Sequence, residues 1–243
     1  MATYTSLTTL DVNEILNLYQ LPSAISLTPI LYGISNTNYL VELASKETVL
    51  LKVSNDKDYH QLQEEMKILL YLQEQQFPLT LKPFLISGGS PVYHYQEYIG
   101  VIFPKAPGKV REVNGPRCEA MGTALAQLHQ IPILTSSLRD YGSIGYDLEK
   151  IESYCLLAEC PSDFLEAFLA IKQSQDWEKF YEFAQQKNRP TAIIHGDLYY
   201  DNVFFDHHKI TMLLDFEQSG IGCPLLDLGI AMTGSCIVDK KIN

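Results

Sequence analysis

The sequence predicts an α+β fold of two lobes, with a small antiparallel sheet in the N-terminal lobe and a mostly helical C-terminal lobe. Short runs rich in Leu, Val, Ile, Thr and Tyr, separated by turn residues, fill much of the chain before residue 104 and are typical of strands. Beyond residue 115 the apolar residues recur mostly at helical spacing. With 243 residues, 46% of them hydrophobic and 19% charged, the chain can bury a sizeable core.

The N-terminal lobe begins with a predicted short helix over residues 10–19, LDVNEILNLY, where apolar side chains recur at helical spacing after Thr8. Three runs follow, SLTPILYG, TNYLVEL and ETVLLKV, and the breaks between them are GISN and ASK. This pattern predicts an antiparallel meander of three strands. Further along the chain, PFLIS and EYIGVIF are interpreted as two more strands.

Residues 58–76 are predicted to form a helix that precedes these last two strands. Glu65 shares one face of this helix with Ile68 and Leu72, at offsets of three and seven. Because that face is apolar, we expect the carboxylate of Glu65 to point inward. A buried carboxylate needs a partner of opposite charge. Lys52, at the end of the run TVLLKV, is the candidate partner.

The boundary between the lobes is placed in the connector FPKAPGK, where Pro104, Pro107 and Gly108 break regular structure. We therefore assign residues 1–106 to the N-terminal lobe with its hinge, and residues 107–243 to the C-terminal lobe. The clearest helices of the C-terminal lobe are predicted over residues 116–130 and 162–187. Two short strands, NVFFD and ITMLLDF, follow them and are separated by HHK at the tip of a hairpin.

Charge and cysteine content argue against several classes of protein. The chain has 18 Lys and Arg against 29 Asp and Glu, a formal net charge of -11, which disfavours binding to nucleic acids or anionic membranes. The 5 cysteines include no C-x-x-C pair, which argues against a disulfide framework and a structural zinc site. The sequence has no signal-peptide pattern and no apolar run near the roughly 18 residues that span a bilayer. We expect a soluble cytoplasmic protein without nucleic-acid or membrane partners.

The stretch IIHGDLYYDNVFFD, residues 193–206, carries the strongest chemical signal. His195 precedes Asp197 by two residues, Asn202 follows Asp197 by five, and Asp215 ends an apolar strand eighteen residues after Asp197. This is the catalytic-loop pattern of kinase-like phosphotransferases, which use ATP. It predicts that Asp197 accepts the proton of an attacking hydroxyl. Asn202 and Asp215 are then the oxygen ligands of Mg²⁺.

A structural role is the alternative for several polar residues of this region. Asp197 could hold the loop by hydrogen-bonding backbone amides. His195 is expected to support the loop through hydrogen bonds rather than to transfer protons. Asp227 is expected to accept backbone hydrogen bonds that fix the loop or a helix start. The rings of Tyr199 and Tyr200 either line an acceptor pocket or pack under the loop.

Two features upstream fit an ATP site. Lys52 is predicted to bind ATP phosphates, and Glu65 on the next helix to orient its ammonium group. The turn YGISNTNY supplies Gly33, Ser35 and Asn36, whose N–H groups and side chains could cover the phosphates. The turn lacks G-x-G-x-x-G, and such residues also join strands in ordinary small sheets.

The segments GISNTNY, VLLKV, FPKAPGK, ALAQLH, HGDLYYDNVFF and LLDFE together resemble the aminoglycoside phosphotransferase and choline kinase superfamily. Within it, the nearest resemblance is to homoserine kinases of the kinase-like type. The similarity runs from about residue 8 to the end of the chain, and HGDLYYDN with LLDFE is its most specific part.

The resemblance implies a two-lobed, protein-kinase-like fold with ATP between the lobes. The adenine is then expected against the connector from Phe103 to Ala106. Carried over by position, the resemblance assigns Asp197 as the catalytic base, Asn202 and Asp215 as magnesium ligands, and Lys52 with Glu65 as the phosphate-binding pair. Glu64 is the alternative to Glu65, because a shift of one residue in matching the helix exchanges the two.

The chain departs from the pattern of this superfamily in two places. Such enzymes usually continue for several tens of residues past the segment matching DLGIAMTGSC, with helices that close the acceptor pocket, whereas this chain stops at VDKKIN. We therefore expect the C-terminal lobe to be incomplete. In addition, Gln218 and Ser219 after LLDFE match no acceptor-binding residue, so none is assigned.

The resemblance implies a magnesium- and ATP-dependent kinase that phosphorylates L-homoserine to O-phosphohomoserine on the route to threonine. A choline, ethanolamine or aminoglycoside kinase with the same machinery is the first alternative. A noncatalytic nucleotide-binding protein descended from such a kinase is the second. The presence of Lys52, Asp197, Asn202 and Asp215 argues against this last alternative, because the loss of any one would indicate a dead site.

Overall fold

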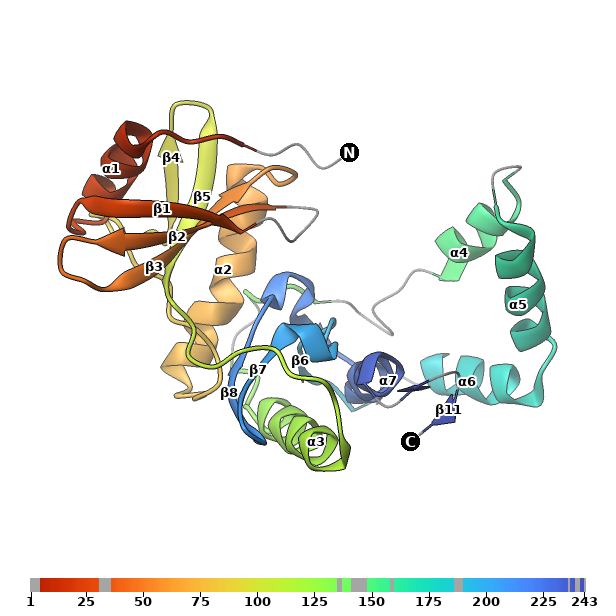
Figure 1. Cartoon of the computed structure of the whole chain (residues 1–243). Helices are drawn as coiled ribbons and strands as arrows, with labels where there is room; N and C mark the ends of the chain where they lie inside the picture. The colour runs from red at the N-terminus through yellow and green to blue at the C-terminus, as the bar shows by residue number, and fades with distance from the viewer. Residues whose placement is uncertain are drawn as a thin grey trace.

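The computed structural model describes residues 5–30, 36–134, 137–140, 148–157, 160–185, 190–235, 237–238 and 241–242. It has the expected α+β architecture, with a small antiparallel sheet in the N-terminal lobe and a mostly helical C-terminal lobe (Figure 1). Among the described residues, no helix is both long and apolar enough to cross a membrane.

The N-terminal sheet has five strands in the order β1-β2-β3-β5-β4, and all neighbours are antiparallel. Its strands are β1 (Ala24–Ile30), β2 (Asn36–Leu43), β3 (Thr48–Ser54), β4 (Val92–Tyr95) and β5 (Tyr98–Pro104). The first three form the predicted meander. The expectation of a strand at PFLIS is wrong, because β4 is VYHY instead. Pro83 cannot donate a backbone hydrogen bond, and the chain turns back where Ile86 N donates to Ser90 O. Only the short segment after this turn, β4, pairs with β5 as a strand.

Alternation along β3 separates the two faces of the sheet. Val49, Leu51 and Val53 are buried in a cluster with α1 (Thr9–Leu18), whereas Leu50 packs on the opposite side in the cluster that contains α2 (Tyr59–Glu74). Lys52 has the parity of Leu50 and therefore lies on the α2 side. Both helices begin with capping boxes, from Thr8 to Asp11 in α1 and from Asp58 to Gln61 in α2, which fix their N-termini.

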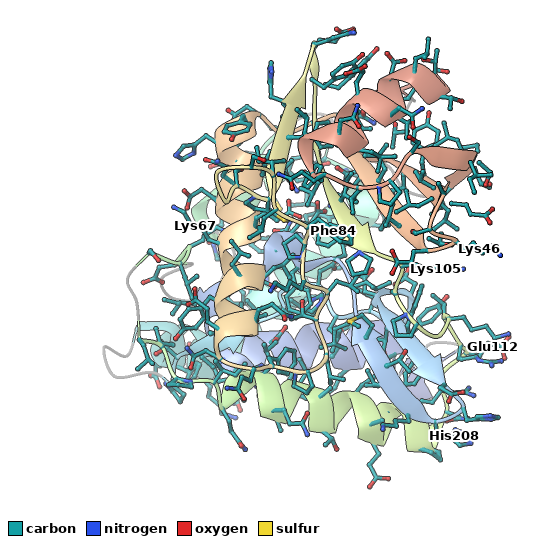
Figure 2. The ribbon with its side chains drawn as sticks, turned by 90° about the vertical axis from the view of Figure 1, so that its left-hand side faces the viewer. Lys46, Lys67, Phe84, Lys105, Glu112 and His208 are labelled. Atoms are coloured by element: carbon teal, nitrogen blue, oxygen red, sulfur yellow. The ribbon has the colours of Figure 1, made fainter. Side chains whose placement is uncertain are left out.

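The C-terminal lobe places short strands between two helices. These elements are α3 (Gly115–His129), β6 (Ala192–Ile194), the 3₁₀ turn η1 (Tyr200–Asn202), β7 (Val203–Asp206), β8 (Lys209–Leu213), η2 (Phe216–Gln218), β9 (Gly220–Gly222) and α7 (Pro224–Ser235). β7 and β8 form the predicted hairpin, and Figure 2 shows His208 at its tip. The antiparallel pair of β6 and β9 was not predicted, because three-residue strands leave no periodic signal.

The remaining helices are α4 (Leu148–Cys155), α5 (Ser162–Lys172) and α6 (Gln175–Gln185), and the short strands β10 (Ile237–Val238) and β11 (Lys241–Ile242) pair with each other near the chain end. The expectation of one helix over 162–187 is wrong, since it breaks between α5 and α6. There Ser174 accepts a hydrogen bond from Trp177 N through its hydroxyl and restarts the helix. None of the described side chains of α5 is buried, and Figure 1 shows α4 to α6 as an arm beside the lobes.

One buried cluster joins the two lobes. It contains Leu72 of α2 and Val101 of β5 together with Leu128 of α3, Phe205 of β7 and Ile210 of β8. α2 thus packs against both the sheet and the C-terminal lobe. The boundary between residues 106 and 107 stays a prediction, because this core runs across it.

Candidate active site

The loop after β6 is held by a buried carboxylate. Asp227, in the first turn of α7, is fully buried and accepts hydrogen bonds from His195 N at 2.9 Å and from Gly196 N at 2.9 Å. It also contacts His129 Nε2 at 2.8 Å. These are the backbone hydrogen bonds expected of Asp227 from the sequence, and they fix the start of the loop that carries Asp197.

Gly196 is required by this loop for two reasons. Its φ is +80°, a left-handed conformation that costs other residues free energy. A Cβ at this position would lie 2.3 Å from the backbone oxygen of Gln218. The glycine therefore allows the loop that carries Asp197 to pack directly against the turn that follows Asp215.

His195 supports the loop through two hydrogen bonds of its imidazole ring. Its Nδ1 accepts a hydrogen bond from Asp197 N at 3.3 Å, so its Nε2 carries the proton and donates to Leu214 O at 2.8 Å. Full burial lowers its pKa below the usual 6.5, although the charge of Asp227 acts in the opposite direction. A neutral His195 thus ties the loop to the strand end that leads to Asp215.

Asp197 and Asn202 form one hydrogen-bonded unit. The amide nitrogen Nδ2 of Asn202 donates to Asp197 O at 2.8 Å and to Asp197 Oδ2 at 3.2 Å. Burial raises the pKa of Asp197, the hydrogen bond from Asn202 lowers it, and the charges of Asp201 and Glu217 raise it further. The net result is a carboxylate with a raised pKa, which suits a group that must accept a proton.

Asp215 follows β8 in a left-handed conformation, with φ 60° and ψ 64°. Its neighbour Phe216 is buried, and the Phe216 ring lies against His195 with centroids 4.6 Å apart. The Asp215 side chain itself is exposed, yet the protein around it raises its pKa by desolvation, while the charge of Lys52 lowers it. The positive charge of Lys52 thus favours the ionised form of Asp215.

Lys52 and Glu65 form the predicted ion pair, with Nζ 3.3 Å from Oε1. Glu65 is 5% exposed, which confirms the inward orientation expected from its helix face. Burial disfavours its charged form, but the ammonium groups of Lys52 and Lys57 lower its pKa below the usual value. Glu64 instead pairs with Lys67 on the outer side of the helix, so the one-residue alternative is not the partner of Lys52.

The other residues expected at the nucleotide site divide into three groups. Gly33 and Ser35 lie outside the described residues. Asn36 begins β2, and its Oδ1 is buried without a hydrogen-bond partner. The side chain of Phe103 is in the core, so only its backbone could contact a nucleotide, while Ala106 is half-buried in the connector.

Sequence reasoning missed three charged residues beside this site. Glu217 in η2 binds Lys57, which also contacts Glu65 at 2.9 Å. Arg139 donates from Nη2 to the backbone oxygens of Glu217 and of Ser219. The acidic residue two positions after Asp215 in LLDFE was a usable signal for Glu217. Nothing in the spacing of Lys57 or Arg139 indicates that they reach this turn.

The chain matches a protein family and several individual relatives. Residues 26–239 match the model of the "Phosphotransferase enzyme family". The homoserine kinase of Bartonella tribocorum is 27% identical over 241 residues, which cover 97% of this chain and 73% of that protein. The homoserine kinase of Janthinobacterium sp. is 25% identical over 242 residues, which cover 98% of this chain and 72% of that protein.

Solved structures share the fold. An amicoumacin kinase in complex with AMP-PNP and Ca²⁺ has a TM-score of 0.67 at 17% identity, covering 93% of this chain and 68% of that chain. A microcompartment-associated aminopropanol kinase has a TM-score of 0.65 at 18% identity, covering 93% of this chain and 74% of that chain. Since the family model spans most of the sequence, the chain belongs to the phosphotransferase enzyme family and is a small-molecule kinase with a two-lobed, protein-kinase-like fold.

Proposed function

We propose that the protein transfers the terminal phosphate of ATP to the hydroxyl of a small molecule, and that the acceptor is L-homoserine. The observation that supports phosphoryl transfer most is that three separate segments bring their polar groups together. Lys52, ordered by Glu65, acts electrostatically on Asp215, and Asp197 is hydrogen-bonded to Asn202 in the adjoining loop. Phosphoryl transfer needs this combination of a cation for the phosphates, oxygen donors and a positioned base.

Asp197 is the proposed catalytic base. Its carboxylate takes the proton of the acceptor hydroxyl while the hydroxyl oxygen forms a bond to the terminal phosphorus and ADP leaves with the electrons of the broken bond. The raised pKa of Asp197 favours this proton transfer. Lys52 binds ATP phosphates, and the carboxylate of Glu65 orients its ammonium group.

Asn202 and Asp215 are the proposed ligands of Mg²⁺. Both are hard oxygen donors, as this ion requires. Because Nδ2 of Asn202 is engaged by Asp197, its Oδ1 is the group left for a cation. When bound, Mg²⁺ would neutralise phosphate charge. We further assign the nucleotide phosphates to the turn with Gly33, Ser35 and Asn36, and the adenine to the connector from Phe103 to Ala106.

The proposal of homoserine rests on relatives named homoserine kinase, which are 27% and 25% identical to this chain. A neighbouring structure is named an aminopropanol kinase, and others are spectinomycin and gentamicin complexes of aminoglycoside phosphotransferases. Amino alcohols, including choline and ethanolamine, and aminoglycosides are therefore the alternative acceptors. A noncatalytic nucleotide-binding role is a third alternative, which the described Lys52–Glu65 pair and Asp197–Asn202 unit disfavour.

The setting of this reaction is also proposed. Residues 1–106 would form the nucleotide-binding lobe, and residues 107–243 the lobe with the catalytic loop. We place the enzyme in the cytoplasm, in the route to threonine, with a small-molecule acceptor and without nucleic-acid or membrane partners. The net charge of -11 supports the absence of binding to polyanions.

An acceptor panel tests the proposal. Release of ADP from Mg·ATP is followed with L-homoserine, choline, ethanolamine, aminopropanol and several aminoglycosides, and the phosphorylated product is identified by mass. We expect O-phosphohomoserine to form with the highest kcat/KM. A higher value for another acceptor would replace homoserine and leave phosphoryl transfer intact. Binding of an ATP analogue without transfer to any acceptor would support the noncatalytic role.

A further inference from the structure

Lys57 connects the two lobes through ion pairs. It lies between β3 and α2, and its ammonium group is 2.9 Å from Glu65 Oε2 and also binds Glu217 Oε2. Glu65 belongs to α2 of the N-terminal lobe, whereas Glu217 belongs to η2, the turn that follows Asp215. One lysine side chain therefore joins the helix that orients Lys52 to the turn that carries Asp215.

The bridge is largely shielded from water. The side chains of Lys57, Glu65 and Glu217 are 20%, 5% and 17% exposed. Loss of the shared ammonium would leave two poorly solvated carboxylates without part of their compensation, which is costly in a shielded site. By contrast, the pair of Lys67 and Glu64 on the same helix is 45% and 34% exposed, and pairs of that kind contribute little.

Lys57 also determines which carboxylate oxygen of Glu65 contacts Lys52. Glu65 divides its two oxygens, with Oε1 at 3.3 Å from Lys52 and Oε2 at 2.9 Å from Lys57. Without Lys57, the carboxylate would be free to turn both oxygens toward Lys52. Lys52 would then be drawn toward α2 and away from a phosphate. Lys57 thus leaves the ammonium group of Lys52 available for a phosphate.

The far end of the bridge is itself fixed within the C-terminal lobe. Arg139 donates from Nη2 to Glu217 O and, at 3.2 Å, to Ser219 O, so this turn is held through its backbone by Arg139 and through the Glu217 side chain by Lys57. The hydroxyl of Ser219 donates to His195 O at 2.9 Å, which joins this turn to the catalytic loop. The contact of Lys57 with the Glu217 side chain therefore fixes the position of α2 relative to this turn and to the loop that carries Asp197.

We propose that Lys57 is a positioning residue for nucleotide binding, which sets the relation of the two lobes and holds Lys52 where it can meet ATP phosphates. Its effect on the nucleotide rests on the proposed function. Its effect on the lobes does not, because the bridge consists only of side chains of this chain. Lys57 needs no contact with the reacting atoms for this role.

Binding of Mg·AMP-PNP by Lys57→Met is the direct test, with Lys67→Met as the matched loss of a lysine–glutamate pair. Figure 2 shows Lys67 on the outer side of α2. We expect Lys57→Met to weaken binding roughly tenfold, because the competent arrangement becomes a minor population. Lys67→Met is expected to bind within about twofold of the unmodified chain. Lys57→Arg, which keeps the charge, should recover most of the lost affinity.

Steady-state kinetics separate positioning from a general loss of structure. Lys57→Met should raise KM for Mg·ATP roughly tenfold and leave kcat within about twofold, since saturating nucleotide selects the competent arrangement. Equal binding and equal KM in Lys57→Met and Lys67→Met would overturn the proposal. If Lys57→Met fails to fold, as judged by circular dichroism, Lys57→Gln takes its place in the same measurements.

Hydrogen exchange tests the bridge without nucleotide. In the ligand-free protein, Lys57→Met should speed the exchange of backbone amides in residues 216–219 relative to the unmodified chain, and Lys67→Met should not. Unchanged exchange in Lys57→Met would show that the bridge does not hold this turn and would overturn the proposal. If the unmodified chain binds no nucleotide, the proposed function and the nucleotide part of this inference fail together, while the exchange still decides the bridge.

Discussion

The two halves of the candidate site are held together by different forces. The loop that carries Asp197 is fixed by hydrogen bonds between backbone groups and buried side chains, among them Asp227 with His195 N and Gly196 N. The half proposed to bind phosphates is fixed by ion pairs among Lys52, Glu65 and Lys57, which come from a strand, a helix and the segment between them. Hydrogen bonds to the backbone hold one geometry tightly, whereas long ionic side chains can exchange partners. We infer that the loop is the rigid half, or platform, of the candidate site and that the ion-paired lysines form its adjustable half.

The largest expected effect is on the rigid half. Asp197→Asn should lower kcat by roughly 10² to 10⁴, the range for loss of a positioned general base, and should change the binding of Mg·AMP-PNP little. Initial rates and calorimetric binding measure the two quantities. Asp206→Asn, at the exposed end of β7, is the control and should keep the rate of the unmodified chain. Normal turnover by Asp197→Asn would remove Asp197 as the base.

The next effect is on the adjustable half. Lys52→Ala should lower kcat/KM for Mg·ATP by roughly 10 to 100, because a charged hydrogen bond to phosphate is lost while the loop stays intact. Lys67→Ala, which removes a lysine from the N-terminal lobe on the outer face of α2, serves as the control. Unchanged kinetics in Lys52→Ala would exclude this lysine from the site.

Asp227→Asn tests whether buried hydrogen bonds hold the platform. The asparagine has one acceptor oxygen for donors that now use both carboxylate oxygens, so a buried N–H group loses its partner. We expect the free energy of unfolding to fall by about 1–3 kcal/mol. Urea titration measures the change, and Asp206→Asn should shift it by less than about 0.5 kcal/mol. Equal midpoints for the two variants would contradict the platform role of Asp227.

The smallest expected effect concerns pH. His195 is buried, and its pKa in the folded chain lies below 6.5, the ordinary value that applies in the unfolded chain. Between the folded and the unfolded pKa, the unfolded chain therefore binds a proton that the folded chain does not. Stability therefore falls as the pH falls below about 6.5, by at most about 1.4 kcal/mol per pH unit from this group. His195→Gln should flatten the fall measured by urea titration between about pH 7 and pH 5. His60→Gln, with an 81% exposed side chain, should not, and equal slopes in both variants would contradict the assignment.

Sequence reasoning was accurate where the determinants are close together in the chain. The meander and the hairpin follow from residue alternation and turn residues, and the inward direction of Glu65 follows from helical spacing. It failed at PFLIS and at the break between α5 and α6. In these places a turn or a single hydroxyl outweighs the propensity of the surrounding residues.

The α+β class and the supporting role of His195 could be read from the sequence alone. So could the candidate site residues and their order along the chain, namely Lys52, Glu65, Asp197, Asn202 and Asp215. Each of these depends on spacing within one element or on a motif of a few residues. Only the tertiary structure places Lys57 on Glu217, although 160 residues separate them. It also decides that Arg139 anchors the same turn and that Asp227 reaches back to His195. Such contacts depend on how complete lobes pack, and no local pattern of side chains encodes that geometry.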